Sequence, residues 1–423
     1  MKPPQNPLRH LHGKLRAMKE QHEERHRPTG FGFAQADRID YLDGALWDAV
    51  AAHGSVFMAR PVLRAMESAG PENVMPRYIL IFRGARPVAA VVAQVVTVNG
   101  SQMRRKNEAS GSGGAKGLMK RLLGPAAAKA ADGWKDRFVV AGNLMSWGCH
   151  GVAFVPGEDA AELWAGVAEA LYRVRRAERL SGETNLAMVK DLTPAQSGVE
   201  TLKRFSYRPL ATEPNMVLDL DPAWRSYEDY LAALDAKYRR KVKDIVKKLA
   251  GAGCQVESLA GDLAAEADRL HELYLAVQGN AAVRLVTLPP AYLPAMAGAL
   301  GEAFRCTTIR QEGRIVGFVT SIRDGDTAIG YYIGFDRTLA ADGLPIYLQL
   351  LHATIADAIH WRCRRLSLGR TALEPKAGLG AKPEPMSVWV RHRVPAMNWL
   401  LQGVLGTVPH SEAPERNPFK AGG

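Results

Sequence analysis

The segment at residues 309–371 constrains the fold of this chain more than any other. It contains two runs rich in β-branched and aromatic residues, 314–320 and 327–335, with an Asp-Gly-Asp sequence at 324–326 between them. This composition, together with the Asp-Gly turn, predicts an antiparallel hairpin. A Glu-Gly pair at 312–313 predicts a second turn that joins the hairpin to a preceding strand. Three consecutive antiparallel strands are therefore expected here.

A helix and a further strand follow these three strands. The helix begins at Pro345, and its apolar residues recur with a period near 3.6, which predicts one buried face. That face consists of Ile346, Tyr347, Leu350, Leu351, Ile355 and Ile359. Residues 364–369 are predicted to form the next strand. This order indicates the α/β class, of the α+β kind, with a mixed, mostly antiparallel sheet flanked by helices.

The first half of the chain shows a similar order of elements, which predicts two modules. It has predicted strands at 78–82 and 87–98, a helix at 160–180 and a closing strand at 215–220. The second half begins with a long predicted helix at 227–249 that has one Lys/Arg-rich face. The predicted division is a basic tail at 1–30, a first module at 31–220 with an insertion at 99–136, a second module at 221–380 and a C-terminal extension at 381–423.

Length and composition indicate a globular protein with two cores. A chain of 423 residues suits two domains. It has no uninterrupted apolar run of about 18 residues, and residues 1–30 lack a hydrophobic signal core, so a cytoplasmic location is expected. The four cysteines are far apart in the sequence, which predicts reduced thiols and neither a disulfide framework nor a zinc site. No metal is expected, since His22 and His26 have a compatible spacing but no third ligand.

Positive charge is concentrated in three segments of the chain, whose formal net charge is +12. Residues 1–30 carry seven Lys/Arg against three acids, residues 100–137 carry nine against three, and residues 237–248 carry seven against one. Such segments suit phosphate-bearing partners, including coenzyme A, nucleotide-sugars, anionic lipid surfaces and RNA. Solvated surface faces account for the same runs equally well, so charge alone does not select a partner.

Residues 207–256 resemble the crossing between the two modules of FemAB-like proteins. The likeness is carried by Tyr207-Arg208-Pro209, by Pro214-Asn215 and the apolar residues that follow, by Tyr238-Arg239-Arg240-Lys241-Val242 and by residues 252–256. FemAB-like proteins carry two GNAT-type acyltransferase modules, and the likeness extends from about residue 55 to residue 369. It implies two GNAT-type modules, each with a mixed, mostly antiparallel sheet flanked by helices.

The resemblance also implies an activity. It indicates an enzyme that transfers an acyl or aminoacyl group to an amine or hydroxyl acceptor, either a small molecule or a cell-envelope precursor, in cell-envelope or polysaccharide biosynthesis. Two alternatives stay open: an acetyl-CoA-dependent N- or O-acetyltransferase, and a non-catalytic envelope-assembly or binding protein on the same scaffold. No DNA partner is expected. A predicted apolar helix at 397–404 either docks on the second module or contacts a membrane surface.

Residues 336–345 bear on the acyl donor. Acetyl-CoA-binding GNAT modules usually carry a glycine-rich loop before this helix, because glycine lets backbone amides approach the pyrophosphate. Here the segment has the single glycine Gly343 next to Asp342. No tightly bound cofactor is expected, and acyl-CoA and aminoacyl-tRNA both remain possible co-substrates, with the second favoured. The basic run at 237–248, which includes Arg239 and Arg240, is the predicted RNA or phosphate contact.

The candidate site residues follow from their positions on the predicted strands. Tyr331 and Tyr332 are expected on opposite faces of one strand, so that Tyr332 lines the cleft, and Asp336 at the strand end is a candidate general base. Arg370, Glu374 and Lys376 lie in the loop after the last strand, where functional residues concentrate. The predicted catalytic residues are therefore Tyr332, Asp336 and Glu374, and the predicted substrate-binding residues are Arg370, Lys376, Arg239 and Arg240. Trp147 is expected in the core.

Overall fold

The computed structural model describes residues 27–99, 135–259, 263–279, 285–395, 397–398, 414 and 416–420, together with residues 16, 19 and 23. Most of the predicted basic tail at 1–30, of the predicted insertion at 99–136 and of the predicted helix at 397–404 lies outside the described residues. The predicted fold class is confirmed, since the described residues form a mixed, mostly antiparallel sheet flanked by helices.

The first half of the chain contributes seven strands and three α-helices to the described structure. Asp43 caps α2 by accepting from the amides of Ala45 and Leu46 at 2.9 and 3.0 Å, and a proline in the first turn begins α3. The elements are β1 (Gly32–Ala36), α2 (Gly44–Ala51), α3 (Arg60–Ala69), β2 (Val74–Arg83), β3 (Arg86–Asn99), β4 (Lys135–Ala141), β5 (Val152–Phe154), α5 (Ala160–Ala177), β6 (Leu186–Leu192) and β7 (Arg208–Asp219).

The second half repeats this order with two additional helices, α6 and α7, at its start. The predicted helix at 227–249 is in fact two helices, because Leu234 adopts an extended backbone and ends the first of them. The elements are α6 (Tyr227–Ala233), α7 (Ala236–Gly251), β8 (Cys254–Ser258), α8 (Ala267–Gln278), α9 (Tyr292–Leu300), β9 (Phe304–Gln311), β10 (Arg314–Asp324), β11 (Thr327–Phe335), α10 (Arg337–Ala341), α11 (Ile346–His360), β12 (Arg365–Ser367), α12 (Leu373–Ala377) and β13 (Lys382–His392).

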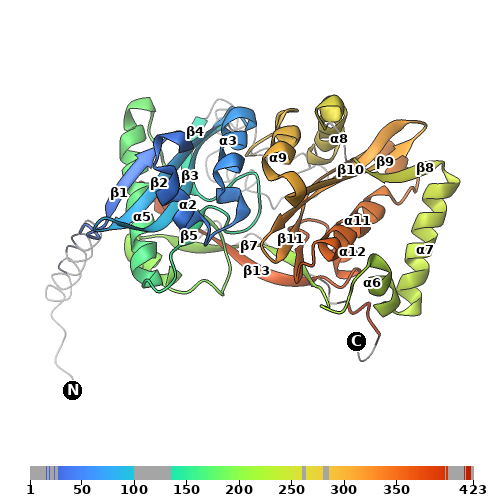
Figure 1. Ribbon diagram of the computed structural model, residues 1–423. Helices are drawn as coiled ribbons and strands as arrows, with labels where there is room; N and C mark the ends of the chain where they lie inside the picture. The colour runs from blue at the N-terminus through green and yellow to red at the C-terminus, as the bar shows by residue number, and fades with distance from the viewer. Residues whose placement is uncertain are drawn as a thin grey trace, which may run out of the picture.

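All thirteen strands belong to one sheet. The strand order is β1-β2-β3-β4-β6-β13-β7-β12-β11-β10-β9-β8, and β5 pairs with β3. In each half one strand pair is parallel, β4 with β6 and β11 with β12, while the other pairs are antiparallel. The two halves lie side by side, and β7 and β13 run between them (Figure 1).

The last strand of the chain, β13, lies within the sheet of the first half. Strand β13 pairs with β7 from Lys382↔Val217 to Val390↔Arg208, and its other edge pairs with β6 of the first half. Strand β7 in turn pairs with β12 of the second half through residues 217–219. Each half therefore receives a strand from the other half.

Strand β13 was not predicted from the sequence. Its first four residues, Lys-Pro-Glu-Pro, include two prolines, which cannot donate to a strand ladder. The structure accommodates Pro385 at a register shift between Glu384 and Met386, where the ladder to β7 is interrupted. The five residues from Met386 to Val390 then pair with β7 without interruption, and Met386, Trp389 and Val390 are buried.

Helices cover both faces of the sheet, and one core is common to both halves. On one face α5 covers the strands of the first half and α11 covers those of the second. On the other face α2 and α3 of the first half pack with α8 and α9 of the second half, in a cluster that includes Trp47, Phe57, Tyr292 and Tyr331. The two halves are thus joined by a shared apolar core as well as by the sheet.

No helix of the described residues is long and apolar enough to cross a membrane. The four cysteines are free thiols, as predicted, and three of them are buried.

Trp389 offers a test of how far the packing of β13 on the first half stabilises the protein. It lies on β13, is 3% exposed and packs in the core beneath α5, so it joins the chain terminus to the first half. We expect Trp389→Ala to lower the free energy of unfolding by about 3–5 kcal/mol, because it leaves a large cavity in that core. Urea unfolding measures this change. Lys382→Ala, an exposed position on the same strand, is the control and should change stability little; an equal loss in both variants would contradict the interpretation.

Candidate functional site

Strand β11 carries a β-bulge at its two tyrosines. Val319 pairs with Ile333 and Ser321 pairs with Gly330, so that Tyr331 and Tyr332 lie opposite the single residue Thr320. The amide of Tyr332 donates to the Thr320 hydroxyl at 2.9 Å. The predicted placement of the two tyrosines on opposite faces is wrong, because the bulge breaks the alternation and the two ring centroids lie 4.5 Å apart.

The strands β11 and β12 separate next to this bulge. They pair in parallel only from Thr327↔Arg365 to Ile329↔Ser367. The side chain of Trp147, from the first half, lies where they diverge: its Nε1 donates to the Ser367 hydroxyl at 3.2 Å, and its indole contacts Gly369 so closely that a Cβ there would lie 3.1 Å from the ring. Trp147 therefore fills the gap between the two strands.

The loop that carries Trp147 is a long excursion from the sheet. Ala141 at the end of β4 pairs with Ala93 of β3, and Val152 at the start of β5 pairs with Val91, so residues 142–151 leave the sheet between two nearby positions. A Cβ on Gly151 would lie 2.5 Å from the Gly142 backbone. Only glycine permits this close approach at the base of the loop.

Hydrogen bonds fix this loop against the second half. The Tyr332 hydroxyl donates to the Met145 carbonyl oxygen at 3.0 Å. The Ser367 hydroxyl, which accepts from Trp147, donates to Asn215 Oδ1 at 3.0 Å, and the Gly369 amide donates to the same oxygen at 3.1 Å. Asn215 lies on β7, so β7, the Trp147 loop and the end of β12 meet at one buried amide side chain.

A cluster of buried charges lies beside this meeting point. Asp191 is fully buried at the end of β6, where its carboxylate forms ion pairs with Lys190 and with Arg370 and accepts from the Gly148 amide at 3.0 Å. Lys190 is 8% exposed and also donates to the Ser146 carbonyl oxygen at 2.6 Å. The two cations and one carboxylate leave the cluster with one net positive charge.

The backbone and the electrostatics of Asp191 are both unusual. Its φ of 58° is left-handed, at a register shift of β6 against β13. Burial alone would raise the pKa of Asp191, but the charges of Lys190 and Arg370 hold that pKa below its ordinary value. Burial also lowers the pKa of Lys190. The Nε of Arg370 has no hydrogen-bond partner among the described residues, so this cluster retains an unused donor.

Lys376 lies close to the same turn. Its ammonium group is on α12, is buried at 3% exposure and donates to the Gly369 carbonyl oxygen at 3.2 Å. No ion pair of Lys376 exists among the described residues, and burial lowers its pKa to about 7. A lysine with this pKa is partly neutral at neutral pH and can accept a proton.

The other predicted site residues lie in different surroundings. The Asp336 carboxylate caps α10 by accepting from the amides of Thr338 and Leu339. Glu374 is exposed and forms an ion pair with Arg416. The structure thus brings Tyr332, Arg370 and Lys376 together around Trp147 and Gly369, whereas Asp336 and Glu374 have other partners. Their catalytic roles stay predictions.

Arg239 and Arg240 lie on α7, at the outer edge of the second half (Figure 1). Arg239 donates to the Ala232 carbonyl oxygen at 3.5 Å, and Arg240 is exposed. The helix buries Val242, Ile245 and Leu249 and presents its basic residues to solvent. The exposed basic residues are Lys237, Arg240, Lys241, Lys243, Lys247 and Lys248.

The start of α11 lacks a phosphate cradle. Pro345 precedes the helix and has no N–H group, and the Ile346 amide donates to the Leu344 carbonyl oxygen at 2.9 Å. Ile346 is fully buried, and Leu339 and Leu344 pack beside it in an apolar cluster. Two of the positions at this helix start therefore offer no free amide to a pyrophosphate, since Pro345 has no N–H group and the Ile346 amide is already bonded.

Four residues at this site were not predicted from the sequence as site residues: Lys190, Asp191, Asn215 and His150. His150 lies in the Trp147 loop, stacks on Phe57 at 4.9 Å and has its Nδ1 3.0 Å from the Ser146 hydroxyl, and burial lowers its pKa to about 4. The adjacent Lys-Asp pair inside an apolar strand was the available signal, since charged residues are seldom placed in a strand core without a partner. Among the described residues no group of three or more His, Cys, Asp or Glu could hold a metal ion.

Comparison with known proteins identifies the second half. Residues 236–377, about a third of the chain, match the family model described as an acetyltransferase (GNAT) domain. Residues 236–377 are therefore similar to a GNAT acyltransferase domain, which confirms for the second half the GNAT-type module predicted from the sequence. Comparison with curated proteins gives no significant match.

Solved structures with similar folds have low identity to this chain. FemX aligns with a TM-score of 0.49 and 9% identity, over 88% of this chain and 100% of its own. A tandem GNAT protein from the clavulanic acid biosynthesis pathway gives 0.48 and 13%, over 86% and 99%. L-PGS from Bacillus licheniformis gives 0.41 and 11%, over 82% and 96%. These values are too low to transfer a substrate.

The charge cluster can be tested at Asp191. We expect Asp191→Ala to lower the free energy of unfolding by about 3–5 kcal/mol, because it leaves Lys190 buried without a carboxylate. Asp191→Asn should cost less, since asparagine tolerates the left-handed backbone and keeps a polar acceptor. Urea unfolding of both variants measures the difference. Asp219→Asn, whose side chain is 72% exposed, is the matched control. Equal stability of wild type and Asp191→Ala would contradict the role given to this carboxylate.

Proposed function

We propose that this protein is an acyltransferase that moves an acyl or aminoacyl group from an activated donor to an amine or hydroxyl acceptor. The match of residues 236–377 to a GNAT domain is the observation that carries the proposal. The sequence resemblance to FemAB-like proteins adds a cell-envelope precursor as the class of acceptor. The reaction lies in the second half, near the point where β11 and β12 separate.

Lys376 is the proposed proton acceptor. The acceptor nitrogen or oxygen forms a bond to the acyl carbon, and its proton passes to the neutral Nζ of Lys376. The bond from the acyl carbon to the donor oxygen or sulfur then breaks, and the leaving group takes a proton from the lysine ammonium. The lowered pKa of Lys376 and its bond to the Gly369 carbonyl, beside the bulged strand, support this role.

Arg370 is the proposed contact for a negatively charged part of the substrate. Its side chain is 24% exposed and forms an ion pair with the buried Asp191 carboxylate. A guanidinium held by Asp191 on one side can present its remaining N–H groups to a carboxylate or phosphate.

Aminoacyl-tRNA is the proposed donor. At the apolar start of α11, Pro345 has no N–H group and the Ile346 amide is already bonded, so fewer amides face a coenzyme A pyrophosphate than at an ordinary helix start, which favours a donor other than acyl-CoA. The exposed basic face of α7 has no ion pairs among the described residues, and it suits the phosphate backbone of an RNA.

The non-catalytic alternative has one observation in its favour. Trp147 fills the gap where β11 and β12 separate, so a donor arm that entered between these strands would meet the indole. A protein that uses the scaffold only for binding needs no such opening. Absence of transfer with either donor would support this alternative and overturn the proposal.

The donor is tested by binding and by transfer. We expect bulk aminoacyl-tRNA to bind with an affinity that falls steeply with salt, and Lys243→Gln/Lys247→Gln to reduce the slope of log K against log salt by about 2. Filter binding measures both effects, and Arg176→Gln/Arg179→Gln, the same charge change on α5 and just beyond it, is the control. A radiolabelled aminoacyl group should pass from the tRNA to an envelope-precursor fraction. A rise in Tm with millimolar coenzyme A, or tRNA binding that ignores salt, would contradict the choice of donor.

Lys376→Met tests the proton acceptor. In the wild type the rate of transfer should rise as pH increases through about 7, because the neutral amine accumulates above the folded pKa. The variant should lose this limb and about 100-fold in rate at pH 8. Lys382→Met, an exposed lysine, is the control. Transfer by Lys376→Met at the wild-type rate would exclude the role.

The same variant has a readout that is independent of substrate. The folded pKa of Lys376 lies below the ordinary value of 10.5, so between these values the unfolded chain binds a proton that the folded chain does not. The wild-type free energy of unfolding should therefore rise with pH in this window, by at most about 1.4 kcal/mol per pH unit. Below pH 7 this slope disappears, because Lys376 is protonated in both the folded and the unfolded chain. Lys376→Met should lack this slope.

A further inference from the structure

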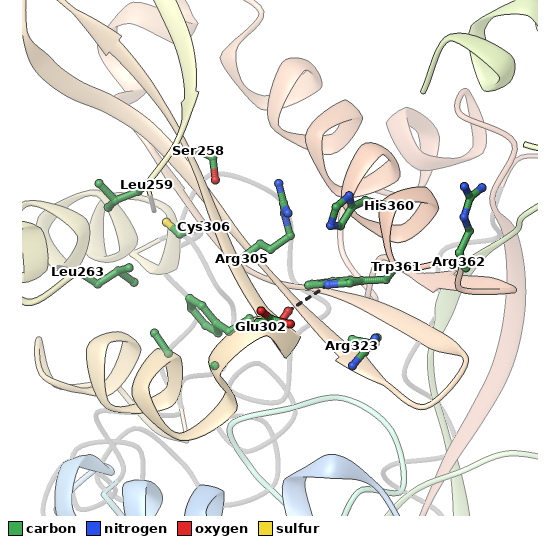
Figure 2. Close-up of a pocket in the computed structure, with 13 residues that line it drawn as sticks. Ser258, Leu259, Leu263, Glu302, Arg305, Cys306, Arg323, His360, Trp361 and Arg362 are labelled. Atoms are coloured by element: carbon green, nitrogen blue, oxygen red, sulfur yellow. Dashed lines mark hydrogen bonds between the residues drawn. The ribbon is translucent and has the colours of Figure 1, made fainter. Parts of the chain in front are cut away.

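A pocket of about 740 Å³ lies in the second half, away from the site described above. It lies where β8 ends: Ser258 pairs with Thr307, and the Leu259 amide donates to the Cys306 carbonyl oxygen at 2.8 Å. The residues that line the pocket come from both faces of the sheet. One wall comes from α9 and its surroundings, and the other comes from the end of α11 (Figure 2).

The wall on the side of α11 is rich in cations. Arg305, Arg323, Arg362 and His360 line it, against the single carboxylate of Glu302 among the described lining residues. Ser321 pairs with Arg305, so Arg323, two residues further along β10, projects from the same face of the sheet. The side chains of Arg305 and Arg323 therefore leave the same face of the sheet.

Arg305 is held in place from behind. Its Nε lies 2.6 Å from Oδ1 of Asp357, a side chain of α11 that is only 5% exposed. The other oxygen of Asp357 accepts from the Ser321 hydroxyl at 2.7 Å. The remaining N–H groups of Arg305 are directed away from this buried pair, and Figure 2 shows its guanidinium beside His360.

The other two arginines of this wall, Arg323 and Arg362, form no ion pair among the described residues. Arg362 donates to the Trp224 carbonyl oxygen at 3.2 Å. Trp361 stands between the cations of this wall with its Nε1 donating to the Glu302 carbonyl oxygen at 3.1 Å, which fixes the indole beside them. Unpaired cations beside an ordered ring make a site for an anion that carries further substituents.

The opposite wall is apolar. Leu259, Leu263, Ala297 and Phe304 line it, with the Cys306 thiol between the two walls (Figure 2). Leu263 and Phe304 belong to the core that the two halves share, so this wall is preformed. Its side chains offer no hydrogen bond and favour a hydrocarbon portion of a ligand.

The pocket is distinct from the proposed reaction site. It lies at the carboxyl end of α11, whose fifteen residues span about 20 Å, whereas a donor phosphate in a GNAT-type module would lie at the amino end. It also lies beside the start of β11, while the bulge at Tyr331 and Tyr332 lies further along that strand.

We propose that this pocket binds a small amphiphile with a phosphate or carboxylate head and an apolar tail. The head lies against Arg305, Arg323 and His360, and the tail lies against Leu259, Leu263 and Ala297. The volume is within the usual range for a small-molecule site. This inference does not depend on the proposed acyl transfer.

Octyl phosphate, octanoate, octyl glucoside and inorganic phosphate are the probes, and isothermal titration calorimetry with the full chain is the measurement. We expect saturable binding of octyl phosphate or octanoate, and the better of the two identifies the head. Octyl glucoside and inorganic phosphate should each bind at least 10-fold more weakly. An equal affinity for octyl glucoside would overturn the proposal, because the cations would then contribute nothing.

Variants separate the two walls. Arg323→Gln should weaken binding of the preferred octyl anion about 10-fold, while Arg314→Gln, an exposed arginine at the other end of β10, should leave it unchanged. Ala297→Phe fills the apolar wall and should abolish binding with all the cations intact, with an unchanged circular dichroism spectrum as the check on folding. If Arg323→Gln lowers Tm but not affinity, the cations only stabilise the carboxyl end of α11, and the proposal fails.

Discussion

The pairing of β7 with β13 is the interaction on which the rest of the structure depends. Strand β13 comes from the end of the chain yet completes the sheet of the first half, and β7 comes from the first half yet pairs with β12 of the second. Neither half can satisfy the backbone hydrogen bonds of its sheet alone, because each lacks one internal strand. The two halves are therefore expected to unfold as one cooperative unit, with Trp389 tying the chain terminus to the first core.

This exchange also places the two parallel strand pairs on either side of β13 and β7. The ends of β6 and β12 lie on either side of β13 and β7, so Asp191 of one half reaches Arg370 of the other. The cost of burying these charges is offset by their mutual pairing and by the Gly148 amide. The Trp147 loop uses the same proximity, since it leaves the first half and hydrogen-bonds to Ser367 in the second. A site shared by both halves results, and the cationic pocket at the far end of α11 is separate from it.

Much of the second half could be predicted because its signals are local. The Asp-Gly turn, the period of the α11 face and the runs of β-branched residues each act within a few neighbours. Strand β13 could not be predicted, since its two prolines argue against a strand and only the partners on both sides, β6 and β7, make it one. The break between α6 and α7 was missed for a similar reason, as Leu234 is apolar and in phase with the helix but is held in an extended backbone. At the site, Arg370 and Lys376 followed from their place after a strand, whereas Lys190 and Asp191 gained meaning only from their partners.

The sequence by itself determined the class of fold, the succession of β9, β10, β11, α11 and β12 and the lack of a glycine-rich loop before α11. Each of these depends on residue types at short separation, which hydrophobic period and turn chemistry encode directly. Only the tertiary structure decided that one sheet passes through both halves, that Trp147 lies between β11 and β12, and that burial lowers the pKa of Lys376. These features arise from contacts between residues up to two hundred positions apart, and the free energy of such contacts depends on burial and geometry that no local pattern specifies.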